Sequence, residues 1–165
     1  MIVSLAAAVG AQVRGQTGSS EKAELIERLG AERALVAGPE ELTEALEGYE
    51  PTVVFDPLGD GFVQPVLEAL TPGGRIVSFG TSAGPEVQMN MQTLYRKGIK
   101  LLGYGGRLVG REQRRHGLRA ALGALAAGDL EVVIDDVLPL DDVNDAFERI
   151  ARRQVKGKLL LGLAD

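Results

Sequence analysis

Residues 52–84 read TVVFDPLGDGFVQPVLEALTPGGRIVSFGTSAG, and this stretch decides the fold because it contains a strand, a helix and a second strand with a turn at each junction. Thr52 to Phe55 is a short β-branched and aromatic run of the kind found in buried parallel strands, and Asp56-Pro57 ends it. Apolar residues then recur at helical spacing until Pro72-Gly73-Gly74. A helix with one apolar face covers a sheet, so the stretch predicts one unit of an open α/β fold.

The second strand of this unit, Arg75 to Phe79, is followed by the glycine-containing loop Gly80 to Gly84. Open parallel sheets bind their ligands at the carboxyl ends of the strands. This loop therefore marks the edge of the sheet where we expect a binding site.

Strands alternate with helices along the rest of the chain, which predicts a doubly wound parallel sheet of the α/β class. A serine is expected to cap the second helix, and the helix at 111–127 is expected to bury Leu118, Ala121, Leu122 and Leu125. The further strands are expected at 12–17, 33–36, 100–104, 132–138 and 157–163, and the further helices at 2–9, 21–29, 40–47, 90–95 and 140–152.

Composition limits the classes of protein to consider. The chain has 165 residues, of which 45% are hydrophobic, so one domain with a substantial core is expected, and no apolar run is long enough to cross a membrane. The net charge of -5 argues against nucleic-acid binding. Cysteine is absent, which removes disulfides, thiolate nucleophiles and cysteine-type zinc sites. No basic region precedes the first apolar run, so the cytoplasm is the expected compartment.

Five segments carry a resemblance to a known family. In their order and spacing they resemble the cofactor-binding half of the medium-chain dehydrogenase/reductase superfamily, within its zinc-independent quinone oxidoreductase branch. They are GAQVRGQTGSSEKAELIERLGA (10–31), VVFDPLG (53–59), LTPGGRIVSFGTSAG (70–84), IKLLGYGG (99–106) and DVLPLDDVNDAFERIARRQVKGKLLL (136–161).

The chain also departs from the family pattern. The family's nucleotide fold begins with a strand and a GxGxxG turn that binds the pyrophosphate, and neither has a counterpart here. The resemblance therefore implies a fragment with an incomplete Rossmann-like domain at residues 1–106 and a C-terminal α+β segment at 107–165 that in the family returns to the catalytic domain. Because the first strand is central in such a sheet, we expect the isolated chain to have low stability.

The end of the first expected strand is the candidate adenosine site. Thr17, Gly18, Ser19 and Lys22 follow that strand, where an NAD site places an acid for the ribose hydroxyls. Hydroxyl and cationic donors instead suit a 2′-phosphate. The resemblance assigns these residues to NADP(H), with Arg14 as a less favoured helper. The alternative is that the serines only cap a helix and that Lys22 is solvated.

The resemblance places the nicotinamide side of the cofactor at two loops that follow adjacent strands and at the turn after a third. Small residues in the loops permit close approach of a ligand. Asp56 is the one acid that suggests a general base, but a carboxylate before proline more often caps a turn, which is the interpretation we prefer. The candidate residues are Asp56, Leu58, Gly59, Phe79, Gly80, Thr81, Ser82, Tyr104 and Gly105.

The only histidine, His116, lies among arginines at 107, 111, 114, 115 and 119. No triad or metal-ligand pattern surrounds it, and a solvated helix face is favoured over an anion site for a phosphorylated substrate or an acidic partner.

Three functions remain open. The first is the NADPH-binding portion of an oxidoreductase that transfers hydride to a quinone or enone, inactive as an isolated chain, with a homodimer formed through the 90–104 edge. The second is a class I S-adenosylmethionine-dependent methyltransferase, because LTPGGR before a strand also occurs in that family. Methyltransferases, however, have an acid at the end of the strand that corresponds to 12–17, and this chain has none there. The third is a non-catalytic remnant that binds a nucleotide or dimerises.

Overall fold

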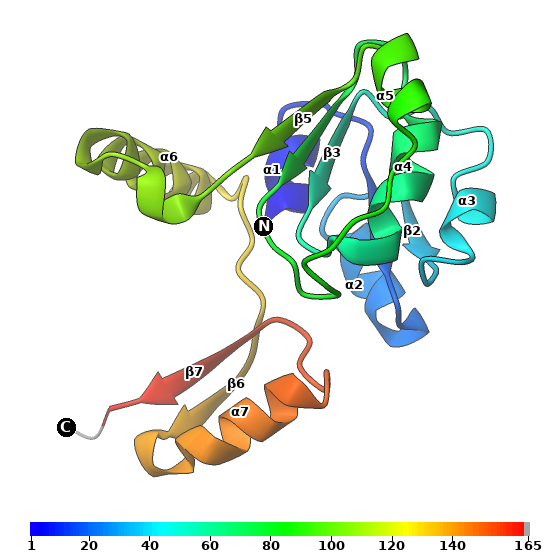
Figure 1. Cartoon of the computed structure of the whole chain (residues 1–165). Helices are drawn as coiled ribbons and strands as arrows, with labels where there is room; N and C mark the ends of the chain where they lie inside the picture. Colours follow the sequence, from blue (N-terminus) through cyan, green and yellow to red (C-terminus); the bar gives the residue numbers. More distant parts are fainter. Residues whose placement is uncertain (164–165) are drawn as a thin grey trace.

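The computed structural model describes residues 1–163 and has the alternating α/β order that the sequence predicts (Figure 1). All paired strands are parallel. The strands are β1 (Arg14–Thr17), β2 (Arg33–Val36), β3 (Val53–Asp56), β4 (Arg75–Ser78), β5 (Lys100–Gly103), β6 (Ile134–Pro139) and β7 (Lys158–Gly162).

Helix α1 precedes the first strand, the other helices lie between strands along the chain, and several begin with a short 3₁₀ turn. The 3₁₀ turns are η1 (Ser20–Lys22), η2 (Asp60–Phe62), η3 (Gly106–Leu108) and η4 (Leu140–Asp142). The α-helices are α1 (Ile2–Ala8), α2 (Ala23–Arg28), α3 (Leu42–Ala45), α4 (Val63–Ala69), α5 (Met91–Arg96), α6 (Arg111–Ala127) and α7 (Val143–Ala151). None of the helices in residues 1–163 is both long and apolar enough to cross a membrane.

The strands form three separate sheets, in the orders β1-β2, β3-β4-β5 and β6-β7. Among the described residues, β1 pairs only with β2, and β3 pairs only with β4. The doubly wound sheet is therefore interrupted between β1 and β3. This is the position that the first strand occupies in a complete Rossmann sheet, so the interruption agrees with the expected missing strand.

The core lies around α4 and joins the first two sheets. Leu67, Leu70 and Ile76 are almost fully buried in one apolar cluster, which contains residues of α4 and β4. A second cluster contains Leu35 of β2 and Leu42 of α3. Side chains on α4 reach both clusters, since Val66 packs against each of them. The apolar helix face predicted from the sequence is thus confirmed.

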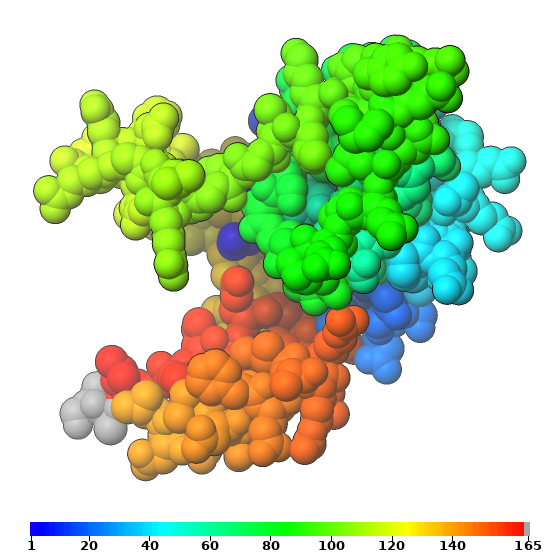
Figure 2. All heavy atoms as spheres, in the orientation of Figure 1, coloured from blue at the N-terminus to red at the C-terminus, as the bar shows by residue number. Residues whose placement is uncertain are grey.

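The predicted burial of α6 is wrong. Leu118, Leu122 and Leu125 are 60%, 56% and 46% exposed, and Ala121 is only half-buried. Figures 1 and 2 show the reason, because α6 extends away from the sheets. Near its N-terminus, Arg114 Nη2 donates to the carbonyl oxygens of Gly106, at 3.1 Å, and Val109, at 3.5 Å.

The open arrangement of the chain leaves a large surface in contact with solvent. The accessible surface is 11355 Å², whereas a compact monomer of 17.5 kDa has about 7,900 Å². Less apolar area is therefore buried than in a compact domain of this length. The surface agrees with the expected low stability, which remains a prediction.

The strands β6 and β7 and helix α7 form a separate C-terminal unit (Figure 1). Arg149 connects α7 to β6 by donating to the carboxylates of Asp135 at 2.9 Å and Asp136 at 2.8 Å. Its hydrogen bond holds the pKa of the Asp136 carboxyl below the ordinary value. The segment before β6 also contacts α2, because Glu131 and Arg28 form an ion pair of 2.6 Å.

Replacing the fully buried Leu67 by alanine tests the packing of α4. We expect L67A to lower the free energy of unfolding by about 2–5 kcal/mol, because it leaves a cavity in the cluster that joins the sheets. The matched control is L118A on the exposed face of α6, with an expected change within about 0.5 kcal/mol. Urea unfolding followed by circular dichroism measures both. Equal losses in the two variants would contradict the described packing.

Candidate cofactor-binding site

The carboxyl ends of β3, β4 and β5 lie side by side at one edge of their sheet. The parallel register pairs Asp56 with Ser78, and Ser78 with Gly103. The loops that leave these three strands therefore begin next to one another. Together with Asp56 at the end of β3, they contain all the residues that the sequence assigned to the nicotinamide side.

The carboxyl end of the β1-β2 sheet faces the same region. Pro39, in the loop after β2, lies against Gly61 in the turn after β3, since a Cβ atom built on Gly61 would be 3.1 Å from the Pro39 Cβ. Phe62 of the same turn packs against the cluster of Leu35 and Leu42. The two sheets thus present their carboxyl ends to a common edge although no hydrogen bond joins them.

Asp56, at the end of β3, is buried and organises the turn that follows it. Its Oδ1 accepts hydrogen bonds from the backbone N–H groups of Leu58 at 2.9 Å and Gly59 at 3.1 Å. The preferred interpretation of Asp56 as a turn cap is confirmed. Its Oδ2 is also buried but finds no partner within residues 1–163. One lone-pair position thus remains at the edge for an additional hydrogen-bond donor.

The loops after β3 and β4 pack directly against each other. The backbone N–H and the hydroxyl of Ser82 both donate to the Pro57 carbonyl oxygen at 3.1 Å, and the N–H of Ala83 donates to the Leu58 carbonyl oxygen at 2.9 Å. Gly59 and Gly84 also form a parallel bridge. These bonds fix the backbone of both loops at the sheet edge.

Two glycines make this close packing possible. A Cβ atom on Gly59 would lie 2.5 Å from the Gly84 carbonyl oxygen, and one on Gly80 would lie 2.7 Å from the Pro57 carbonyl oxygen. The backbone of Gly59 has φ 70 and ψ -149, a region that side-chain-bearing residues rarely adopt. The absence of side chains at these two positions thus allows the loops after β3 and β4 to pack against each other.

The remaining residues assigned to the nicotinamide side lie on the exposed side of the same loops. The Phe79 N–H donates to the Asp56 carbonyl oxygen at 3.0 Å, and Thr81 follows next to Gly59. The Tyr104 N–H donates to the Ser78 carbonyl oxygen at 2.8 Å, and its side chain is exposed. Gly105 precedes η3. The structure therefore brings these residues to one edge, and their role in binding remains a prediction.

Thr17 and Ser19 at the end of β1 are linked to each other. The buried Thr17 hydroxyl oxygen accepts the Ser19 N–H at 3.2 Å. Ser19 precedes η1, but its side chain makes no capping hydrogen bond, so the predicted serine cap is wrong. The helix begins here as a 3₁₀ turn, which differs in geometry from the α-helical start that a serine caps. The Ser19 hydroxyl is consequently left for another partner, and Gly18 beside it is exposed.

Lys22 makes a long-range contact that the sequence did not indicate. Its Nζ donates to the carbonyl oxygen of Arg153, at 3.3 Å, although 131 positions separate the two residues. Glu21 is the first acid after β1, and its carboxylate lies 3.2 Å from Lys156 Nζ. Arg14 does not join this group, because its guanidinium lies over the Tyr49 ring, 3.9 Å from the centroid.

The donors at the end of β1 fit a phosphate better than a ribose diol. The Ser19 hydroxyl and the Lys22 ammonium supply donors, and Thr17 supplies a hydroxyl already bonded to the backbone. A ribose diol requires an acceptor carboxylate, whereas the carboxylate of Glu21 after β1 is paired with Lys156. The chemistry of these residues is compatible with the 2′-phosphate of NADP(H), and their role in binding it remains a prediction.

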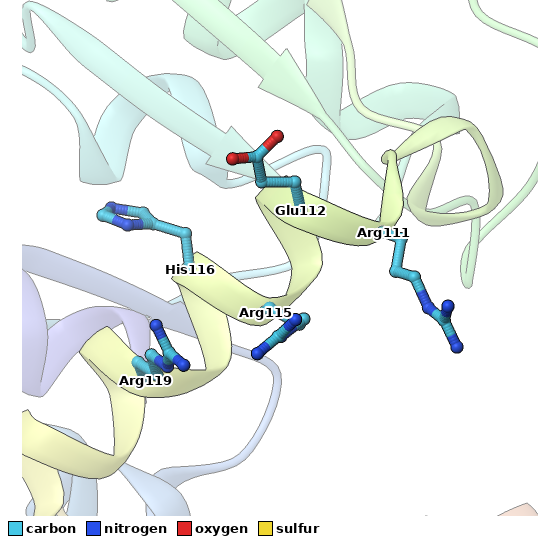
Figure 3. Close-up of a pocket in the computed structure, with 5 residues that line it drawn as sticks. All are labelled: Arg111, Glu112, Arg115, His116 and Arg119. Atoms are coloured by element: carbon cyan, nitrogen blue, oxygen red, sulfur yellow. The ribbon is translucent and has the colours of Figure 1, made fainter.

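The arginine and histidine cluster of α6 does not form a converging site. Figure 3 shows Arg111, Arg115, His116 and Arg119 projecting from the helix in different directions. Arg114 is bound to backbone carbonyls of the preceding segment. A solvated helix face agrees with this arrangement. Residues 1–163 also contain no group of three or more His, Cys, Asp or Glu side chains placed to hold a metal ion.

In the comparison with protein families, the zinc-binding dehydrogenase model matches residues 1–123. Among curated proteins, quinone oxidoreductase 1 of Escherichia coli (strain K12) is 28% identical over an alignment of 165 positions, which covers 94% of this chain and 50% of that protein. The chain spans about half the length of the curated relatives it matches.

Solved structures share the fold. A crystal structure of an NAD-dependent alcohol dehydrogenase superposes with a TM-score of 0.82 at 26% identity, covering 98% of this chain and 47% of that one. The crystal structure of E. coli K-12 YHDH with bound NADPH has a TM-score of 0.79 at 20% identity, covering 96% of this chain and 49% of that one. The second likeness concerns the fold alone.

Gly59 and Gly73 provide a matched test of the loop contact. Both have a positive φ, 70 and 77, but a Cβ atom on Gly73 would meet nothing within 4 Å. We expect G73A to cost about 1 kcal/mol of unfolding free energy from backbone strain alone. G59A should cost about 1–3 kcal/mol more because the added methyl displaces the 80–84 loop. Denaturant unfolding measures both, and equal costs would contradict the contact between the loops.

Proposed function

The chain belongs to the zinc-binding dehydrogenase family, and we propose that it is the NADP(H)-binding portion of an oxidoreductase that transfers hydride to a quinone or enone acceptor. The observation that carries this proposal is the donor set at the end of β1. Ser19 and Lys22 supply a hydroxyl and an ammonium at the position where an NAD site needs a carboxylate acceptor. The name of the E. coli relative, quinone oxidoreductase 1, supports the acceptor class.

In this proposal the adenosine end of the cofactor lies at β1 and its nicotinamide end at the β3-β4-β5 edge. Thr17, Gly18, Ser19 and Lys22 hold the 2′-phosphate. The backbone of the loops 56–59 and 79–82, with the 104–105 turn, orients the nicotinamide. NADP(H) supplies the hydride chemistry when bound, and the chain supplies position and electrostatics. The NAD-dependent alcohol dehydrogenase among the solved structures makes NADH the competing cofactor.

We further propose that this chain alone does not turn over substrate. The described residues form a proposed nucleotide-binding surface at the carboxyl ends of the strands. They place no converging acid and base next to this surface, because Asp56 is bound to its own turn. The matched relatives are about twice as long. Binding and turnover are therefore expected to separate in this protein, so the two have to be measured independently.

A cofactor titration tests the proposal. NADPH, NADH and S-adenosylmethionine are titrated against the chain by calorimetry. We expect NADPH to bind at least about tenfold more tightly than NADH, because a phosphate on charged donors adds at least one strong hydrogen bond. Preferential binding of S-adenosylmethionine would support the methyltransferase alternative, and equal affinity for NADH and NADPH would contradict the 2′-phosphate assignment.

The variant K22Q makes the same test residue-specific. It should weaken NADPH about tenfold and leave NADH unchanged, because it removes a cationic donor that only the 2′-phosphate uses. K100Q is the matched control, since Lys100 is the first residue of β5 and so lies at the amino end of that strand, away from the proposed cofactor edge. Equal effects of the two variants would indicate a general loss of positive charge and would contradict a site at Lys22.

We also propose that two copies of the chain join through β5. This strand pairs only with β4 among the described residues, and Leu101, Leu102 and Tyr104 are 46%, 44% and 58% exposed on it or beside it. Exposed apolar edge strands are usually covered by a partner. We expect a dimer in sedimentation velocity and a shift of L101K to monomer. The control L118K, on α6, should leave the dimer intact, and a wild-type monomer would contradict the proposal.

A further inference from the structure

Asp56 is the one ionisable residue that is buried within residues 1–163, where it is 5% exposed. It ends β3, and the parallel register places it beside Ser78 at the carboxyl end of β4. The backbone N–H of Phe79 donates to its carbonyl oxygen at 3.0 Å. The Asp56 carboxylate is therefore enclosed at the base of the loops that are proposed to orient the nicotinamide.

The turn after β3 accounts for only one of the two Asp56 carboxylate oxygens. Oδ1 accepts the N–H groups of Leu58 and Gly59, whereas the buried Oδ2 has no partner in the described part of the chain. An asparagine makes the same turn with its side-chain oxygen and carries no charge. Burying a carboxylate that lacks a compensating partner costs free energy. The turn thus explains the shape of this side chain but not its negative charge.

The loops near Asp56 supply no positive charge to compensate it. Residues 56–74 and 76–95 contain no lysine or arginine. Arg75, between these stretches, begins β4 and so lies at the amino end of that strand. The first base after β5 is the exposed Arg107, which forms no ion pair within residues 1–163. The nicotinamide end of the proposed site is therefore anionic, in contrast to its adenosine end.

We propose that the Asp56 carboxylate selects the redox state of the cofactor and favours NADP⁺ over NADPH. This inference rests on the proposed function and adds a specificity-determining residue at the nicotinamide end. The oxidised nicotinamide ring carries a positive charge and the reduced ring carries none, so a fixed negative charge attracts only the oxidised ring. Burial strengthens this attraction, because solvent ions screen a buried charge less than an exposed one.

The same charge favours hydride donation by the bound cofactor. Hydride donation breaks the C4–H bond of the reduced ring and transfers both electrons of that bond to the acceptor, which takes one proton from water and leaves the ring positive. Asp56 moves no proton, since its Oδ1 stays bonded to the turn. It instead stabilises the positive charge that develops as the hydride leaves. This direction agrees with the proposed reduction of a quinone or enone.

Calorimetry with both redox forms tests the role of Asp56. NADP⁺, NADPH and adenosine 2′,5′-bisphosphate, which has no nicotinamide, are titrated against the whole chain and against D56N. We expect the wild type to bind NADP⁺ about tenfold more tightly than NADPH. D56N should bind the two forms about equally and leave the bisphosphate unchanged, because its amide oxygen can still accept the N–H groups of Leu58 and Gly59.

D60N is the matched control for the loss of one negative charge. Asp60 belongs to the same turn but is exposed, and asparagine tolerates its φ of 47. The ratio of the two affinities should stay within about twofold of the wild-type ratio, because water and salt screen an exposed charge. If D56N instead weakens all three ligands by the same factor, Asp56 acts only as a turn cap and its role in redox selection is overturned.

The wild-type titration remains decisive even where D56N does not fold. If the wild type binds NADP⁺ and NADPH equally, the role of Asp56 is overturned while the proposed cofactor stands. Equal changes of the affinity ratio in D56N and D60N would also overturn it, since burial would then not matter. If the wild type binds neither redox form nor the bisphosphate, the proposed function itself fails, and this inference falls with it.

Discussion

The packing of α4 is the interaction on which the rest of the structure depends. The β1-β2 sheet and the β3-β4-β5 sheet share no strand pairing in residues 1–163, so apart from the connecting chain they are held together by side-chain contacts. Val66 packs against both apolar clusters, and Leu67 beside it is fully buried. Apolar burial is non-directional, whereas a continuous sheet would fix strand spacing by hydrogen bonds. The two ends of the candidate site therefore depend on a contact with few geometric constraints.

This dependence explains how rigidity is distributed over the candidate site. Backbone hydrogen bonds and glycine contacts tie the loops after β3 and β4 to each other, and Asp56 fixes the turn that follows β3. The end of β1 belongs to the other sheet and is tied instead to the C-terminal unit through Lys22 and Glu21. In the proposed binding mode a dinucleotide extends over both regions. Under that proposal its affinity depends on their separation as well as on each local donor set.

Local patterns predicted much of the fold, because they depend on nearby residues. The strand β2 has the predicted bounds, and β3 and β4 agree within one residue at each end. Asp56 before a proline correctly indicated a turn cap. The exposed leucines of α6 show the limit, since helical spacing identifies an apolar face but not whether anything covers it. The Ser19 cap failed because a 3₁₀ turn replaces the first α-helical turn, a choice that residue type alone does not decide.

The adenosine end of the site shows why local patterns are insufficient for specificity. In the proposed site, the residues after β1 favour a phosphate over a ribose diol because no carboxylate is available there, and this feature is only partly local. Glu21 is present in the sequence, and its charge is offset by Lys156, which lies 135 positions further along the chain. The same segment supplies the carbonyl oxygen that orients Lys22. The electrostatic character of the site therefore arises from the tertiary contact between η1 and the segment after α7, which no spacing within either segment encodes.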